Sequence, residues 1–295
     1  MSEPRKRNEE KYQELKKEDS TLDNAVLCEK IADDNITWWL DEALYWRKKG
    51  IEMREKVCGK KNIENTPYYD KIVEILLEKG SYKEAIKWNK KSFNIKIQTE
   101  GKDSPQLLNN ELLFAETMIL LERYTECKTY LDAAYLILED NNALLDKKTK
   151  YNAYLELMHL YSNYNIGAKY EGLEVVVNNK ICGDKAINIS KDIYGENSIE
   201  TAEALRLKAI TIKDNKTEAL ELFKEAIKIY MMVEDNEKYG KQIFHDIRQK
   251  WESENVLEES AKWLCKNSSK EFVLKAIKDF SESDQQKVKQ ALKLV

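Results

Sequence analysis

The side chains that most often carry acid–base or metal chemistry are scarce in this chain. It has two histidines, His159 and His245, and they are 86 residues apart. A zinc hydrolase signature places two histidines one helical turn apart with a glutamate between them, and the sequence has no such motif. We therefore predict that both histidines are ordinary helix residues and that the chain holds no metal ion.

The five cysteines are widely spaced, and none belongs to a CxxC pair; they are Cys28, Cys58, Cys127, Cys182 and Cys265. A catalytic cysteine needs a base and an oxyanion hole, and no pattern in the sequence supplies them. Each cysteine falls in or beside a segment with helical periodicity, so we expect small-residue packing. An odd number of distant cysteines in a long chain favours reduced thiols, as in a cytoplasm.

A phosphate-binding loop needs closely spaced glycines at the start of a helix. Gly167 and Gly172 are five residues apart, but the Gly-Lys-Ser/Thr that would complete the motif is missing, and no GxGxxG occurs. We predict no cofactor. An enzyme is the weakest of our hypotheses, because no group of residues suggests a reaction.

The composition favours a helical protein. Glycine occurs 9 times and proline 3 times in 295 residues, well below the roughly 12% that the two supply in an average protein. Strands joined by tight turns need these residues at many corners, so a β-sandwich or barrel is excluded.

Charge and hydropathy limit the classes of partner. The net charge of −4 argues against a nucleic-acid binder, which usually concentrates a basic face. No apolar run is long enough to span a bilayer, so we expect no membrane partner. The N-terminus lacks the apolar stretch of a secretory signal, and we expect a cytoplasmic protein.

A repeat of 42 residues runs through the first half of the chain. Its anchors are the small residues Ala43, Ala85 and Cys127. An aromatic residue follows each anchor after three residues, and a second small residue follows after seven; these are Trp46, Trp88 and Tyr130, then Gly50, Ser92 and Ala134. Such small residues allow a neighbouring helix to approach closely, and the aromatics fill the remaining space.

The same frame continues downstream with anchors at Asn179, Ala219 and Ala261, after steps of 52, 40 and 42 residues. The long step implies an insertion of about ten residues near Ile166 to Val176. Apolar residues with helical spacing precede the anchors; in the second unit they are Tyr69, Ile72, Val73, Leu76 and Leu77. Each unit is therefore predicted to be helix A, a turn and helix B, which must stack on its neighbours to cover its apolar face.

This pattern resembles the tetratricopeptide repeat (TPR), in the 42-residue version found in kinesin light chains and many bacterial proteins. The stretches Gly101–Pro105 and Gly195–Ala202 are similar to the loops that join successive units in that family. The resemblance implies an all-α, right-handed α-solenoid of about five to six TPR-like helix pairs with C-terminal capping helices. Its members bind other proteins in many settings.

We divide the chain accordingly into three parts. Residues 1–20 form a polar helical lead-in, and residues 21–268 form the solenoid, with an irregular unit and an insertion near 166–180. Residues 269–295 form one or two capping helices, with a break at Ser281 to Asp284.

The resemblance also implies which residues line the concave groove, because helix A faces it in this family. The predicted groove residues are Asp70, Glu74, Glu78, Asn109, Glu116, Tyr151, Tyr154, Met158, Tyr161 and Lys208. The groove would be acidic toward the N-terminal half and aromatic in the middle. Two alternatives stay open: the carboxylates form a solvated face, and the tyrosines are packed by the insertion.

Such a groove suits a protein or peptide with Lys or Arg beside apolar side chains. The leading hypothesis is a non-enzymatic interaction scaffold that holds a partner in the groove. The alternative is a regulatory sensor whose solenoid changes conformation when it binds a short peptide or a partner enzyme.

Two tryptophans, Trp251 and Trp263, are expected to fill the last repeat.

Overall fold

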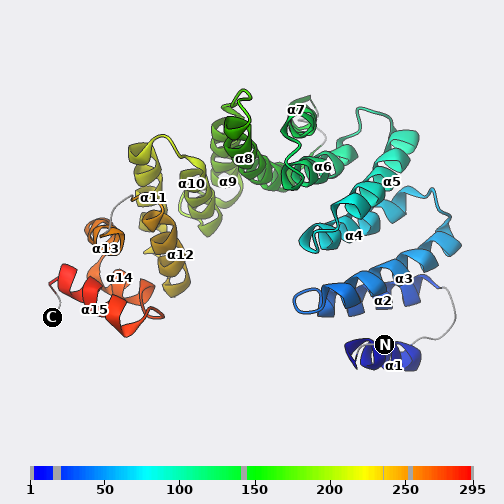
Figure 1. Ribbon diagram of the computed structural model, residues 1–295, viewed down its shortest axis with the longest axis horizontal. Coiled ribbons are helices and arrows are strands. Elements are labelled where there is room, and N and C mark those ends of the chain that lie inside the picture. The colour runs from blue at the N-terminus through cyan, green and yellow to red at the C-terminus, as the bar shows by residue number, and fades with distance from the viewer. Residues whose placement is uncertain (1–2, 16–20, 141–144, 235, 252–254, 294–295) are drawn as a thin grey trace. The chain divides into compact units, whose positions relative to one another are not determined.

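A computed structural model describes residues 3–15, 21–140, 145–234, 236–251 and 255–293 (Figure 1). Across these residues the chain forms fifteen α-helices, two short 3-10 helices and no strand. The all-α prediction is confirmed. Among the described helices, none is both long enough and apolar enough to cross a bilayer.

Six consecutive helix pairs make up most of the chain. They are α2 (Leu22–Asn35) with α3 (Leu40–Cys58), α4 (Thr66–Glu78) with α5 (Tyr82–Glu100), α6 (Leu108–Leu120) with α7 (Tyr124–Asp140), α8 (Lys147–Tyr170) with α9 (Asn178–Tyr194), α10 (Ile199–Thr211) with α11 (Lys216–Tyr230), and α12 (Glu237–Arg248) with α13 (Val256–Asn267). Helix α1 (Glu3–Leu15) precedes them, and α14 (Lys270–Ala276) and α15 (Glu282–Ala291) close the chain. Within each unit, successive pairs pack on one another through α3 and α4, α5 and α6, α9 and α10, and α11 and α12, as in an α-solenoid.

The helices group into two compact units. The first unit contains Met1–Leu145 and Asn163–Val175, and the second contains Asp146–Ser162 and Val176–Val295. The division therefore falls within helix α8.

The repeat anchors lie at the contacts between helices. All six are buried; they are Ala43, Ala85, Cys127, Asn179, Ala219 and Ala261. Gly50, seven residues after the first anchor, shows why small residues are needed. A Cβ atom there would lie 3.2 Å from both the Ala25 carbonyl oxygen and the Cys28 Cβ, so glycine lets α3 lie close against α2.

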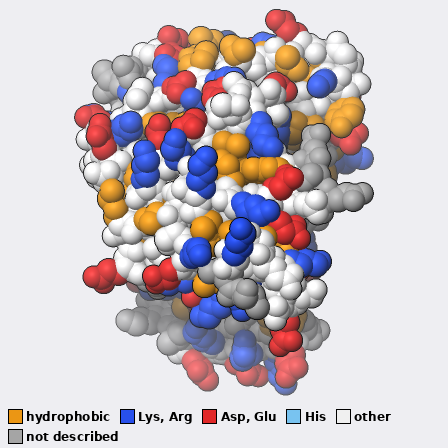
Figure 2. Space-filling model, turned by 90° about the vertical axis from the view of Figure 1, so that its left-hand side faces the viewer, with side chains coloured by type: hydrophobic (Ala, Val, Ile, Leu, Met, Phe, Trp, Pro, Cys, Tyr) orange, Lys and Arg blue, Asp and Glu red, His pale blue; other side chains and the backbone are white. Residues whose placement is uncertain are grey.

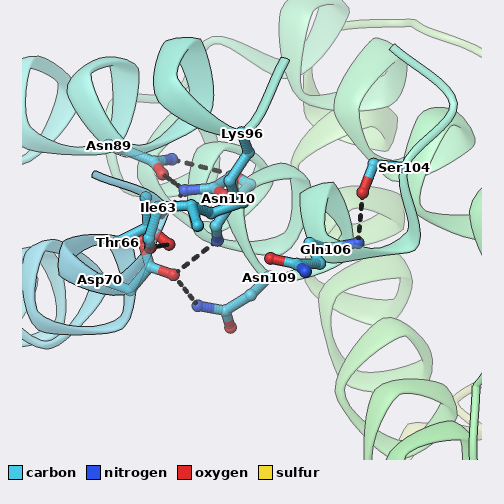
Figure 3. Close-up of polar contacts among 9 residues, drawn as sticks. All are labelled: Ile63, Thr66, Asp70, Asn89, Lys96, Ser104, Gln106, Asn109 and Asn110. Atoms are coloured by element: carbon cyan, nitrogen blue, oxygen red, sulfur yellow. Dashed lines mark hydrogen bonds and ion pairs between the residues drawn. The ribbon is translucent and has the colours of Figure 1, made fainter. Parts of the chain in front are cut away.

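The loops between pairs use local capping. Helix α5 ends at Gly101, whose φ of 93° favours glycine. A short 3-10 helix, η2 (Pro105–Leu107), follows. The Ser104 hydroxyl accepts the Gln106 backbone N–H at 3.2 Å and fixes its start (Figure 3). Helix α6 begins directly after this 3-10 helix, at Leu108.

Helix α8 accounts for the long step in the repeat. It has 24 residues, whereas α4, α6 and α10 have 13 each. Its last turns contain Gly167, and a Cβ atom there would collide with the Tyr124 ring. The end of α8 therefore packs tightly against α7, and the connection to α9 follows it.

Both ends of the described chain are tied down. In α1, Tyr12 is buried and its ring lies 5.3 Å from that of Trp46. At the other end, the Ser281 hydroxyl accepts the Asp284 backbone N–H at 3.1 Å and caps α15, so the break between α14 and α15 ends at Ser281 and residues 282–284 are helical. Residues 16–20 of the predicted lead-in lie outside the described residues.

Candidate partner-binding surface

Three carboxylates of the first unit gather on helices α4 and α6, and we call them the acidic face: Glu74, Glu78 and Glu116. Glu74 and Glu78 are one helical turn apart and exposed, while Glu116 is half-buried on the neighbouring helix. Among the residues that the structure describes, none of the three forms an ion pair. Lys71 and Arg47 act on Glu74 only at a distance, so none of the three carboxylates is in direct contact with a cation of the described chain.

The pKa shifts of Glu74 and Glu116 show that the carboxylates of the acidic face repel one another. Burial by surrounding protein raises the pKa of Glu74, although the side chain keeps contact with solvent, and the charges of Asp70 and Glu116 add to this effect. Burial also raises the pKa of Glu116, and the charge of Glu78 adds to it. Lys71 opposes the shift at Glu74 without cancelling it. A cation placed here would relieve the repulsion between like charges.

Asp70 begins the same helical row but has a different role. Its side chain is buried, and its Oδ2 accepts hydrogen bonds from Lys96 Nζ at 2.9 Å and Asn109 Nδ2 at 3.2 Å (Figure 3). Its Oδ1 accepts from Asn110 Nδ2 at 3.1 Å. Asp70 is therefore not free to line a groove. The expectation that Asp70 lines the groove is corrected, because this end of α4 packs against α5 and α6 and is not exposed to solvent.

Asn89 of α5 completes this buried polar network. Lys96 Nζ donates to Asn110 Oδ1 at 2.7 Å, and Asn110 Nδ2 donates to Asn89 Oδ1 at 2.6 Å. Asn89 Nδ2 in turn donates to the Asn110 backbone oxygen at 2.9 Å. The sequence analysis missed Lys96, Asn89 and Asn110. The spacing of seven residues between Asn89 and Lys96, on the helix face that also carries Ser92, was the available signal.

Asn109 connects the network to the surface. Its side chain is exposed beside the acidic face, yet its amide donates to buried Asp70. A ligand that contacts Asn109 would therefore also touch the network that joins α4, α5 and α6.

Nearer the N-terminus, a second buried ion pair was also missed. Arg47 of α3 is buried and contacts Glu29 and Asp33 of α2. Burial raises the pKa of Glu29, and the Arg47 charge opposes that rise. The charges of Lys71 and Arg47 oppose the rise in pKa at both Glu29 and Glu74, so the two sites share an electrostatic environment.

The four residues of the predicted aromatic stripe are core residues; they are Tyr151, Tyr154, Met158 and Tyr161, and each is no more than 6% exposed. Helix α9 covers them. The Tyr151 ring lies 5.9 Å from that of Tyr194, and Asn178 Nδ2 donates to the Tyr161 hydroxyl at 3.2 Å. The expectation of an exposed aromatic groove is corrected, because this face of α8 meets helix B of its own pair.

Lys208 of α10 is likewise buried, and its Nζ donates to Asp184 Oδ1 at 2.5 Å. Its aliphatic chain crosses Gly183, where a Cβ atom would lie 2.8 Å from Lys208 Cγ and 2.9 Å from Met158 Sδ. The side chain is enclosed by α9, so it does not offer its charge to a groove. The predicted site thus reduces to Glu74, Glu78, Asn109 and Glu116.

Comparison with solved structures supports the fold. The chain is similar to the crystal structure of BtubC (BKLC) from P. vanneervenii, a kinesin light chain-like TPR protein, with a TM-score of 0.52 and 12% sequence identity. The match covers 86% of this chain and 92% of that chain. No family model and no curated protein matches the sequence. The likeness shows a TPR-like helical repeat fold.

Proposed function

We propose that this protein is a non-enzymatic interaction scaffold of the cytoplasm, built from kinesin-light-chain-like 42-residue repeats. Its acidic face holds a partner segment that carries Lys or Arg beside apolar side chains. The observation that carries the proposal is the set of three neighbouring carboxylates, none of which forms an ion pair with the described residues. A partner that supplies cations gains attraction at each position and also removes the repulsion among them.

An apolar contact is available beside these charges. Leu120 of α6 lies one helical turn beyond Glu116 and is 42% exposed. A partner side chain that covers Leu120 would add buried apolar area to the charge pairs. The charges set register and direction, and the apolar contact adds affinity.

A second candidate, a regulatory sensor, rests on Asn109. Because this residue is both exposed and bonded to Asp70, a bound segment that takes its amide would weaken one contact of the buried network. Each repeat contacts only its neighbours, so a change between α4 and α6 would alter the next contact along the chain. Small-angle scattering of the full chain with and without peptide separates a sensor, which changes its profile, from a rigid scaffold.

A titration of the full chain with a synthetic peptide tests the scaffold. The peptide alternates Lys and Leu, and a matched peptide carries Gln in place of Lys. We expect the Lys peptide to bind and the Glu74→Lys/Glu116→Lys variant to lose at least tenfold in affinity, about 1.4 kcal/mol. The control variant, Glu52→Lys/Glu64→Lys, changes two exposed residues without ion pairs elsewhere in the first unit.

Equal affinity of the wild type and the acidic-face variant would contradict the proposal. So would equal binding of the Gln peptide, because the charges would then contribute nothing.

A further inference from the structure

Lysines and tryptophans from four segments converge in the second unit. Lys213 lies between α10 and α11, Lys216 begins α11, Trp251 follows α12, and Trp263 lies on α13. We call these four residues the lysine–tryptophan cluster. None of them was predicted to bind a partner, and the proposed function does not use them.

The rings and one ammonium group are in direct contact. Lys216 Nζ lies 4.1 Å from the centroid of the Trp251 ring, a cation–π distance. The Trp251 and Trp263 rings lie 6.3 Å apart at an angle of 63°, edge to face. Both indoles are half-buried, so each keeps some exposed apolar surface.

The neighbouring Lys250 fixes the position of Trp251. Its Nζ donates to the Ile210 backbone oxygen at 3.2 Å and the Ile212 backbone oxygen at 2.7 Å, at the end of α10. Burial lowers the pKa of Lys250 to about 8, and the positive charge of Lys213 adds to this effect. Lys250, and with it the adjacent Trp251, is thus held at the end of α10 near Lys213.

The two lysines of the cluster are exposed to solvent. Within the described part of the chain, Lys213 and Lys216 form no ion pair, and neither does Lys266, one turn after Trp263. Figure 2 shows one side of the molecule, on which Lys and Arg side chains lie beside hydrophobic ones with Asp and Glu side chains among them. In the cluster itself, exposed Lys216 lies over the half-buried Trp251 ring.

Lysines beside apolar side chains are the features that we propose for a partner of the acidic face. We propose that the lysine–tryptophan cluster of one molecule binds the acidic face of a second copy of the same chain, an inference that rests on the proposed function. Lys213 and Lys216 approach Glu74, Glu78 and Glu116 of the other copy. Their ammonium groups form the ion pairs that the carboxylates of the acidic face do not make within the described chain.

The indoles suit the apolar part of the same contact. Trp251 and Trp263 are large rings with exposed area, and Leu120 is the exposed apolar residue beside the acidic face. Aromatic residues are enriched at protein interfaces for this reason. A head-to-tail contact of this kind is heterologous, so it continues into longer chains or closes into a ring.

The cluster fits other anionic partners less well. Single-stranded nucleic acid stacks its bases on open aromatic faces, whereas Lys216 occupies a face of Trp251. A phosphate site often uses the free N–H groups of a helix N-terminus. At α11 the Asn215 side chain accepts the Glu218 N–H and caps that end.

Sedimentation velocity of the full chain tests the inference. We expect association with a dissociation constant on the order of 10 μM at low salt, because exposed ion pairs are individually weak. Association falls sharply in about 0.5 M salt, since the charges are screened. A wild-type chain that stays monomeric up to about 100 μM at low salt would overturn the proposal.

Charge reversal on each surface gives the sharper test. We expect Lys213→Glu/Lys216→Glu and Glu74→Lys/Glu116→Lys to be monomeric separately and to associate when mixed in equal amounts. The matched controls are Lys191→Glu/Lys228→Glu, two exposed lysines without ion pairs in the second unit, and Glu52→Lys/Glu64→Lys. Controls that associate like the wild type support the proposal, and a mixture that stays monomeric overturns it. Far-UV circular dichroism checks that every variant is folded.

The two proposals fail in different ways. If the Lys–Leu peptide binds the acidic face while the chain stays monomeric, the self-association is wrong and the proposed function stands. If neither the peptide nor a second copy binds, both are wrong. Binding of the cluster to a single-stranded oligonucleotide, lost in Lys213→Glu/Lys216→Glu without self-association, would also overturn the inference.

Discussion

Helices α4 and α8 are both predicted from the sequence to line the partner-binding groove, but their predicted groove residues differ in exposure. On α4, Glu74 and Glu78 are exposed although Asp70 of the same row is buried, whereas on α8 the predicted residues, Tyr151 and Tyr161 among them, are all covered by α9. Both rows follow helical spacing. The comparison shows that spacing identifies a face of a helix, while the helices packed against that face decide which of its residues meet solvent.

Core truncation on α8 gives the largest expected effect. Tyr161→Ala removes a fully buried ring, and we expect the free energy of unfolding to fall by about 3–5 kcal/mol. The matched control is Tyr170→Ala on the same helix, whose side chain is 89% exposed and whose loss should cost no more than about 0.5 kcal/mol. Urea denaturation measures both. Equal losses would remove the distinction between the two faces.

The buried network of α4 gives the next effect. Lys96→Met leaves the Asp70 carboxylate buried without its cation, and we expect a loss of about 3 kcal/mol. The double variant Asp70→Leu/Lys96→Met should lose less than the sum of the single losses, because no charge is left unpaired. Additive losses in a denaturation cycle would show that the ion pair does not couple the helices.

A smaller, pH-dependent effect separates buried from surface carboxylates within the first unit. Glu111 of α6 is buried, its Oε2 has no hydrogen-bond partner, and burial raises its pKa from the ordinary 4.5 to about 7. Ionisation therefore costs stability as the pH rises through this window. We expect Glu111→Gln to gain about 2 kcal/mol over the wild type at pH 8 relative to pH 5. Urea denaturation at both values checks this, and a pH-independent difference would contradict it.

Much of the fold follows from the sequence because the repeat signal is set by packing. Small residues at a fixed period must lie where helices touch, and all six anchors are buried. The extra length at the fourth unit was visible as a long step, but its form, a longer α8, was not. The spacing of the anchors gives the length of an insertion, but it does not show whether the insertion extends a helix or a loop.

Less of the candidate site was predictable. Glu74 and Glu78 are exposed and Glu116 is half-buried, and their place in a partner-binding groove stays a prediction. Asp70 shares their spacing, yet it is buried and forms an ion pair with Lys96 of α5. Such long-range partners are set by tertiary packing, which a single helical pattern does not encode.

Hydrogen–deuterium exchange of the full chain with the Lys–Leu peptide tests the central claim, that the acidic face accepts a basic and apolar segment. The account predicts slower exchange in α4 and α6 on binding, and no such change in the Glu74→Lys/Glu116→Lys variant. Protection confined to α3, α5 and α7, or protection that survives in that variant, would contradict it.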